Sequence, residues 1–176
     1  MEVIDTPLLD CKVIKNTSFG DERGFFMESF NQQKFEQSGL NFEVCQMNLA
    51  RSEKNVLRGL HYQKGSSAQA KLVGVISGSV LDVVVDIRPD SATFKKYFKF
   101  KLQNINDLIF VPRGCAHGYL SLEDNTTFYY LVDNQYDPKN EAGIRYNDPE
   151  LSIDWSLTSD PIVSDKDQKQ PLFKSI

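Results

Sequence analysis

Short runs of Val, Ile, Phe and Tyr recur along the chain and are separated by turn-forming residues. Within several runs apolar and polar residues alternate, which is the period of a β-strand with one buried face. Many short strands spaced by turns are typical of a sandwich or barrel. We therefore expect an all-β fold, with strands in the runs "CKVIKNT", "GFFMESF", "KLVGVISG", "SVLDVVVDIR", "DLIFVP" and "TTFYYLV".

The run "SVLDVVVDIR" has one apolar face and one partly polar face. If it is a strand, the first face carries Leu81, Val83, Val85 and Ile87, and the second carries Val80, Asp82, Val84, Asp86 and Arg88. A polar face of this kind either meets solvent or lines the wet interior of a barrel. The alternation alone does not choose between these two arrangements.

Only the segment 31–39, "NQQKFEQSG", has a clear helical pattern, and Gly39 is its expected C-terminal cap. The tail from Ser164 is expected to add a helical turn or two. No repeat, low-complexity tract or linker divides the chain, and 176 residues are enough for one domain with a sizeable core. We expect a single domain over residues 1–176.

The balance of charge argues against a nucleic-acid partner. The chain has 20 basic and 24 acidic residues, a net charge of −4, and no basic stripe. The first ten residues, "MEVIDTPLLD", lack the order of charged, apolar and small residues found in a signal peptide, and no apolar run is long enough to cross a bilayer. The sequence thus predicts a cytoplasmic protein without a membrane partner.

The cysteines and histidines do not form a recognisable metal or nucleophile motif. Cys11, Cys45 and Cys115 are an odd number without CxxC spacing, as expected of unpaired thiols in a reducing compartment. Cys115 lies two residues before His117, but a buried structural cysteine is the more ordinary interpretation. With only His61 and His117, a three-histidine metal site is impossible in one chain. A site of two histidines and one carboxylate stays open, but we expect no metal and no cofactor.

Five blocks of sequence resemble the dTDP-4-dehydrorhamnose 3,5-epimerase family in order and almost without gaps. They are "QMNLARSEKNVLRGLHYQ", "AQAKLVGVISGSVLDVVVDIRPDSATF", "VPRGCAHGY", "YNDPELSIDW" and "SDKD", and the match spans roughly residues 19 to 167. The resemblance implies a cupin-type jelly-roll barrel with a few short helices, a homodimer, and metal-free epimerisation of a nucleotide-linked 4-keto-6-deoxyhexose at C3 and C5. Such an activity belongs to deoxysugar and cell-surface polysaccharide biosynthesis.

The resemblance also implies the residues that carry out the chemistry. Removing a hydrogen from the carbon beside a ketone gives an enolate, so the site needs a base, a group that stabilises the oxyanion, and an acid on the far side. The family's base matches His61, its carboxylate partner matches Asp167, its cation beside the ketone matches Lys71, and its acid matches Tyr130. Tyr129 would point the opposite way in a strand, so the assignment depends on the register.

The remaining family positions match residues expected to bind substrate. The segment "FGDERGFFMES" is expected to hold the nucleotide across the dimer, so that each nucleotide site is shared between subunits; its matched residues are Phe19, Arg23, Phe26 and Glu28. His117 matches a residue that lines the site. Contacts to sugar or pyrophosphate are expected from Gln46, Asn48, Arg58, Gln63 and Tyr136.

Two features of the sequence complicate this assignment. Arg58 and His61 are three residues apart, so strict alternation would send them to opposite faces, although a bulge at Gly59 would reconcile them. In "MNLARS", Leu49 and Ala50 replace commoner polar residues of the family. The open alternatives are therefore an epimerase that inverts one carbon only or acts on another nucleotide sugar such as a GDP-linked heptose, a non-catalytic sugar-binding barrel, and a metal-dependent cupin isomerase.

Overall fold

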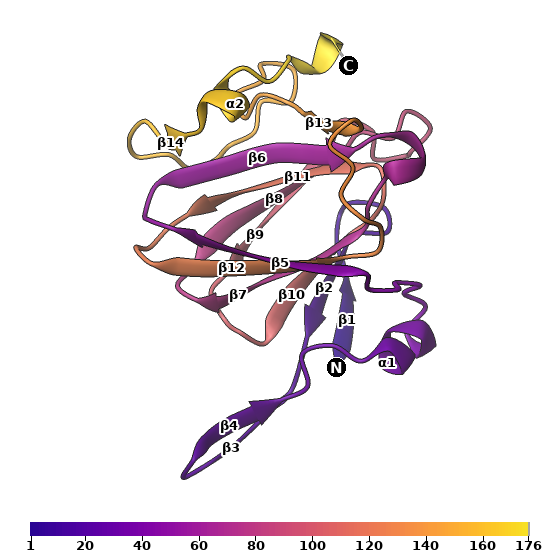
Figure 1. Ribbon diagram of the computed structural model, residues 1–176, viewed down its shortest axis with the longest axis vertical. Helices are drawn as coiled ribbons and strands as arrows, with labels where there is room; N and C mark the ends of the chain where they lie inside the picture. Colours follow the sequence, from indigo (N-terminus) through magenta and orange to yellow (C-terminus); the bar gives the residue numbers. More distant parts are fainter. Residues whose placement is uncertain (176) are drawn as a thin grey trace.

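The computed structural model describes residues 1–175, and two sheets that face each other form its core (Figure 1). All pairings between neighbours along each sheet are antiparallel. The first sheet has the order β1 (Glu2–Asp5), β2 (Lys12–Lys15), β10 (Asp107–Val111), β7 (Lys71–Ser77), β12 (Thr126–Val132) and β5 (Gln46–Ser52).

The second sheet carries the C-terminal part of the chain on its outer face. Its order is β13 (Glu141–Gly143), β6 (Val56–Gln63), β11 (Cys115–Ser121), β8 (Val80–Asp86) and β9 (Tyr97–Leu102). The short strand β14 (Ile162–Val163) pairs in parallel with β6, and helix α2 (Asp165–Gln168) follows it directly. Together the sheets form the all-β, cupin-type barrel that the strand pattern and the family resemblance predicted.

A hairpin projects from the barrel between the first two strands and the first helix. Strands β3 (Ser18–Asp21) and β4 (Gly24–Met27) pair only with each other and extend away from both sheets (Figure 1). Helix α1 (Gln32–Gln37) lies within the predicted segment 31–39, with Gly39 just beyond its end at φ +78°. Two 3₁₀ turns, Gly65–Ser67 and Phe173–Ser175, complete the regular structure.

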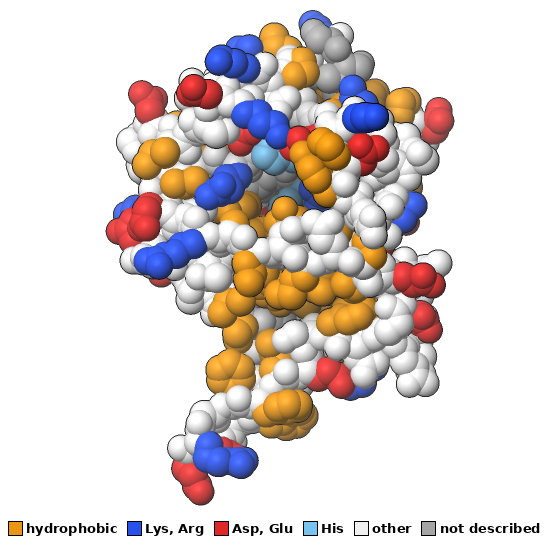
Figure 2. Space-filling view, viewed as in Figure 1, with side chains coloured by type: hydrophobic (Ala, Val, Ile, Leu, Met, Phe, Trp, Pro, Cys, Tyr) orange, Lys and Arg blue, Asp and Glu red, His pale blue; other side chains and the backbone are white. Residues whose placement is uncertain are grey.

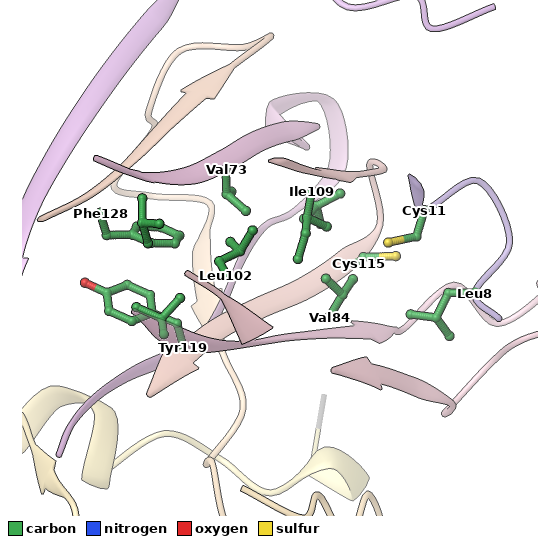
Figure 3. Close-up of a cluster of buried hydrophobic side chains, with 12 residues drawn as sticks. Leu8, Cys11, Val73, Val84, Leu102, Ile109, Cys115, Tyr119 and Phe128 are labelled. Atoms are coloured by element: carbon green, nitrogen blue, oxygen red, sulfur yellow. The ribbon is translucent and has the colours of Figure 1, made fainter. Parts of the chain in front are cut away.

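Three clusters of buried apolar side chains hold the sheets together. One fills the space between the sheets, where the Tyr119 and Phe128 rings stack with their centroids 4.2 Å apart (Figure 3). A second lies around α1, and the third lies between the outer face of the second sheet and the C-terminal segment, where Trp155 and Phe173 are buried. The C-terminal segment is therefore an integral part of the packed structure.

Strand β8 shows which way the partly polar face of "SVLDVVVDIR" points. Val80 and Val84 belong to the cluster between the sheets, and Asp82, on the same face, is completely buried. Val83 and Val85 pack on the opposite side, under the C-terminal segment. The polar face thus lines the interior of the barrel, which is the second of the two arrangements that the pattern left open.

Candidate active site

A cavity of about 300 Å³ opens at one side of the barrel between the two sheets. Its histidine atoms are visible inside the hollow in Figure 2, with cationic and acidic side chains around the opening. It is lined by Ala50, Arg58, His61, Tyr62, Gln63, Gln69, Lys71, His117, Gly118, Tyr119, Phe128, Tyr130, Tyr136 and Glu141. Three of the four predicted catalytic residues and four of the ten predicted binding residues therefore meet at one cavity.

A bulge in β6 turns Arg58 and His61 to the same side. His61 pairs with His117 and Arg58 with Tyr119, so β6 uses three steps where β11 uses two. Gly59, at φ +119°, provides the extra residue. A Cβ there would lie 2.6 Å from the Gly118 Cα, so only glycine fits this close approach. The bulge that the sequence required is present.

His61 is paired with Asp167, which α2 brings onto β6 from the far end of the chain. The His61 Nε2 and Asp167 Oδ1 atoms are 2.6 Å apart, and the Gly59 N–H donates to Asp167 Oδ2 at 3.2 Å. The Asp167 side chain is 5% exposed, against 33% for His61. Burial alone would raise the pKa of Asp167, but the hydrogen bond and charge of His61, with the Gly59 N–H, lower it overall.

Because Asp167 occupies Nε2 of His61, the other ring nitrogen is the one left for chemistry. Within residues 1–175, Nδ1 of His61 has no hydrogen-bond partner in the protein. A carboxylate on one imidazole nitrogen fixes the tautomer and strengthens the basicity of the other. The pair thus has the arrangement that a general base requires, and His61 lines the cavity.

A second histidine–carboxylate pair lies deeper in the barrel. His117 Nε2 and Asp82 Oδ2 are 2.7 Å apart, and both side chains are buried. The other oxygen, Asp82 Oδ1, has no protein partner within the described part of the chain. Asp82 thus orients His117.

Lys71 and Tyr130 come from the opposite sheet, on strands β7 and β12. Burial lowers the pKa of Lys71 to about 8, although Asp82 and Glu141 act in the other direction. Burial also raises the pKa of Tyr130, so its phenol is protonated at neutral pH. Tyr129 points away into the cluster around α1, so the register places Tyr130 at the cavity, as the family resemblance implied.

Several predicted binding residues lie outside the cavity of the single chain. Gln46 and Asn48 lie on β5, where the Gln46 Nε2 donates to Asn48 Oδ1, and Gln46 Oε1 accepts from the Tyr136 N–H. Phe19, Arg23 and Phe26 lie on the projecting hairpin, and Glu28 follows it and pairs with Lys34. The structure therefore does not bring the hairpin residues to this chain's own cavity.

The sequence reasoning missed several lining residues, of which Tyr119 and Glu141 make polar contacts at the site. Tyr119 stands two residues after His117 on β11, so strand alternation could have placed it on the same face. Its hydroxyl lies 3.1 Å from Ser52 Oγ, which also accepts from Arg58 Nε. Glu141 accepts from the Tyr136 hydroxyl at 2.7 Å, and no local pattern in the sequence marks it.

Three further observations bear on the expectations from composition. Among residues 1–175 no three His, Cys, Asp or Glu side chains are grouped as metal ligands. Cys11 and Cys115 are buried, and burial raises the pKa of each thiol. No helix in the described part of the chain is long and apolar enough to span a membrane.

A half-buried imidazole–carboxylate pair, a lysine with a lowered pKa and a protonated tyrosine lie around one cavity, which is the equipment of an acid–base enzyme on a cupin-like barrel. Residues 5–175 match the family model of dTDP-4-dehydrorhamnose 3,5-epimerase. The chain belongs to this family, and it is an isomerase with the epimerase activity of dTDP-rhamnose biosynthesis that gives the family its name.

The relatives resemble this chain over almost its whole length. The Escherichia coli dTDP-4-dehydrorhamnose 3,5-epimerase is 46% identical over 171 residues, which are 96% of this chain and 92% of that protein. The crystal structure of the Elizabethkingia anophelis enzyme is 47% identical, covers 99% of this chain and 97% of its own, and superimposes with a TM-score of 0.94. The Legionella pneumophila epimerase, solved in complex with dTDP-4-keto-L-rhamnose, is 40% identical, with coverage of 99% and 94% and a TM-score of 0.95.

Proposed function

We propose that this protein converts dTDP-4-dehydro-6-deoxyglucose to dTDP-4-dehydrorhamnose by inverting C3 and C5 in turn. The observation that carries the proposal is the meeting of His61, Lys71 and Tyr130 at one cavity of about 300 Å³. The dTDP-linked sugar bound in the Legionella pneumophila relative supports the choice of substrate. Both inverted carbons adjoin the same C4 ketone, which makes their hydrogens acidic, so one set of residues serves both steps.

Each inversion begins with proton removal by the neutral His61. Its Nδ1 takes the proton from the carbon beside the ketone, and the electron pair of that C–H bond moves to the ketone oxygen as an enolate. The protonated Lys71, buried where charge interactions are strong, stabilises the oxyanion. Asp167 stabilises the imidazolium that His61 becomes and keeps its ring in place.

Tyr130 completes the inversion from the opposite side of the sugar. The enolate collapses to the ketone as the carbon takes the phenol proton, which leaves a tyrosinate and an imidazolium. Exchange with solvent then returns a proton to Tyr130 and removes one from His61. Because acid and base come from different sheets, the proton that leaves and the proton that arrives can use opposite faces of the ring.

The nucleotide is expected to contact more than one copy of the chain. Arg58, Gln63 and Tyr136 line the cavity and supply groups for the sugar and pyrophosphate. The projecting hairpin carries Arg23 with exposed phenylalanines, and it cannot serve the cavity of its own chain. A homodimer in which each hairpin reaches the partner's site would use both features.

Proton exchange with solvent tests this assignment directly. In deuterated water, the wild-type protein should label dTDP-4-dehydro-6-deoxyglucose at both C3 and C5, as read by NMR. His61→Ala should lose exchange and epimerisation together, by about 10²- to 10⁴-fold. Tyr130→Phe keeps the base and the cation, so it should exchange deuterium faster than it forms inverted product.

The same experiment separates the alternatives. Label at only one of the two carbons would identify a single-carbon epimerase, and label at neither would exclude this sugar as the substrate. If His61→Ala exchanged deuterium at the wild-type rate, His61 would not be the base, and its role would be in binding or structure. The other candidate sugar, a GDP-linked heptose, is tested by substituting it in the same assay.

A further inference from the structure

The block "YNDPELSIDW", residues 146–155, lies outside the cavity, and the proposed chemistry does not use it. It contains Asp148, a carboxylate that is only 2% exposed. A buried carboxylate is costly unless hydrogen bonds and charges stabilise it, so its contacts indicate what it holds in place. These contacts lead to the segment that carries Asp167.

Both oxygens of Asp148 accept hydrogen bonds from backbone N–H groups. Oδ1 accepts from the N–H groups of Glu150 and Leu151, each at 2.9 Å, which fixes the turn of its own block. Oδ2 accepts from the Phe173 N–H at 2.8 Å, across 25 residues of chain. Asp148 therefore connects this turn to the end of the C-terminal segment.

The segment 162–173, which we call the C-terminal strap, is attached at both ends with Asp167 between them. At its beginning, β14 pairs with β6, and the Ile162 N–H donates to the Asn55 carbonyl oxygen at 2.8 Å. At its end, the Arg145 N–H donates to the Pro171 carbonyl oxygen at 3.0 Å. The ring of Phe173, the last residue of the strap, is buried in the apolar cluster on the outer face of the second sheet. Figure 1 shows this part of the chain, in yellow, lying along β6.

The middle of the strap has little of its own to keep it in place. Helix α2 has four residues, which is too short to be stable alone, and its cap is the Ser164 hydroxyl, which accepts from the Asp167 N–H. The Lys166–Glu141 ion pair has its lysine 58% exposed and its carboxylate 21% exposed, and solvent weakens a pair of this kind. Apart from the hydrogen bonds that Asp167 itself makes with His61 and the Gly59 N–H, its position thus depends on the two attached ends of the strap.

From these contacts we infer that Asp148 is a positioning residue for the epimerase reaction, acting through the strap to hold Asp167 on His61. The inference rests on the proposed role of His61 and Asp167. Removal of the Asp148 carboxylate frees the Phe173 N–H and loosens the downstream end of the strap. A displacement of Asp167 by an ångström is enough to weaken a base of this kind by up to about 10²-fold.

The kinetic test compares two aspartates of the same block. Asp148→Ala should lower kcat by about 10- to 100-fold and change KM by less than about 2-fold, because no residue of the strap lines the cavity. Asp148→Asn keeps one carbonyl oxygen as an acceptor, so it should lower kcat by a smaller factor than Asp148→Ala. Asp154→Ala removes an exposed carboxylate that pairs with Lys99, and it should keep the wild-type kcat.

A double variant asks whether Asp148 acts through Asp167. If it does, Asp148→Ala should lower kcat by less than about 2-fold in a protein that already carries Asp167→Ala. A role in the general stability of the fold would lower kcat by the same factor in both backgrounds. Equal factors would therefore overturn the inference.

NMR of the imidazole N–H protons gives a test that needs no turnover. The proton held between His61 and Asp167 should appear far downfield and should vanish in Asp148→Ala, while the proton between His117 and Asp82 remains as an internal control. Persistence of the His61 signal, or loss of both signals, would overturn the inference. Absence of deuterium exchange into the substrate in the wild-type protein would instead refute the proposed function. The imidazole proton signals would still show whether Asp148 holds the strap in place.

Discussion

Lys71 shows how burial can adjust a single residue to the task proposed for it. Its side chain is 8% exposed in the cavity wall, and removal from water lowers the pKa of its ammonium group to about 8. At neutral pH the group is still mostly protonated, as a cation that stabilises an enolate must be. The same shift lowers the stability of the folded protein below pH 8, because the charged lysine is less favourable in the folded than in the unfolded chain. This cost disappears as the pH rises from about 8 toward 10.5, the ordinary pKa of lysine.

The pKa of Lys71 predicts an alkaline limit to activity. We expect kcat/KM, which reports on the free enzyme, to fall as the pH rises through about 8, because Lys71 then loses its charge. Tyr130 does not account for this limb, since burial raises its pKa above the ordinary value of 10.0. Lys71→Arg should move the limb to higher pH, and Lys71→Met should lower the rate at every pH.

The control is Lys54→Met, which removes an exposed lysine outside the cavity. It should leave the pH profile of kcat/KM unchanged. A limb near pH 8 that persisted in Lys71→Arg would assign the limb to another group.

Individual site residues differ in how well the sequence could place them. His117 and Tyr130 lie in strands whose alternation and family order put them on the face that lines the cavity. Asp167 has the local sequence of a solvated tail, and its partner lies 106 residues away, so no local pattern could show that it is buried. The family resemblance supplied this pairing, because it records a contact that only the folded chain creates.

Among the elements, β6 is shaped by its bulge more than by its hydrophobic pattern. The extra residue at Gly59 brings Arg58 and His61 to one face, and the Gly59 N–H also binds Asp167. The strand pattern predicted where the strand lies and why it must be irregular. It could not predict that the bulge also contacts the C-terminal strap, since that contact depends on the arrangement of distant segments.

Gly59→Ala should disrupt both the fold and the site. The new Cβ would lie 2.6 Å from the Gly118 Cα and 2.8 Å from the His117 carbonyl oxygen, at a φ of +119° that other residues rarely adopt. We expect the free energy of unfolding to fall by about 2–5 kcal/mol and epimerase activity to be lost. Urea unfolding and the deuterium-exchange assay measure the two effects.

Gly39→Ala separates backbone strain from the steric clash. Gly39 also has a positive φ, +78°, but a Cβ added there would meet no atom within 4 Å. This variant should lose only about 1–2 kcal/mol and keep its activity. If Gly59→Ala and Gly39→Ala lowered the free energy of unfolding and the activity equally, the close approach of β6 to β11 would contribute nothing beyond backbone strain.

At the scale of the whole molecule, the main unexplained feature of the isolated chain is its exposed apolar surface. Phe19, Phe25 and Phe26 on the hairpin are 67%, 60% and 71% exposed, and Met47 and Leu49 on the edge strand β5 are 54% and 63% exposed. Figure 2 shows apolar side chains extending from below the cavity to the hairpin. A surface of this kind is typical of a protein interface, and the proposed homodimer would cover it.

If the hairpin of one subunit completes the site of the other, two inactive chains should restore each other. An Arg23→Ala chain keeps His61, and a His61→Ala chain keeps the hairpin, so a mixed dimer contains one site with both groups and one with neither. Random mixing makes half of the dimers mixed, so the mixture should recover about a quarter of wild-type activity. The recovery should depend on subunit exchange and should appear after the two proteins are unfolded and refolded together.

The control mixture combines His61→Ala with Asp167→Ala. These residues contact each other within one chain, so each chain of a mixed dimer still has a broken base and no complete site can form. This mixture should stay inactive, and sedimentation should show dimers in both cases. Two outcomes would contradict the shared site: a monomer in sedimentation, or activity in the first mixture no higher than the average of its two parent proteins. Either would mean that each chain binds its nucleotide alone and that the hairpin has another use.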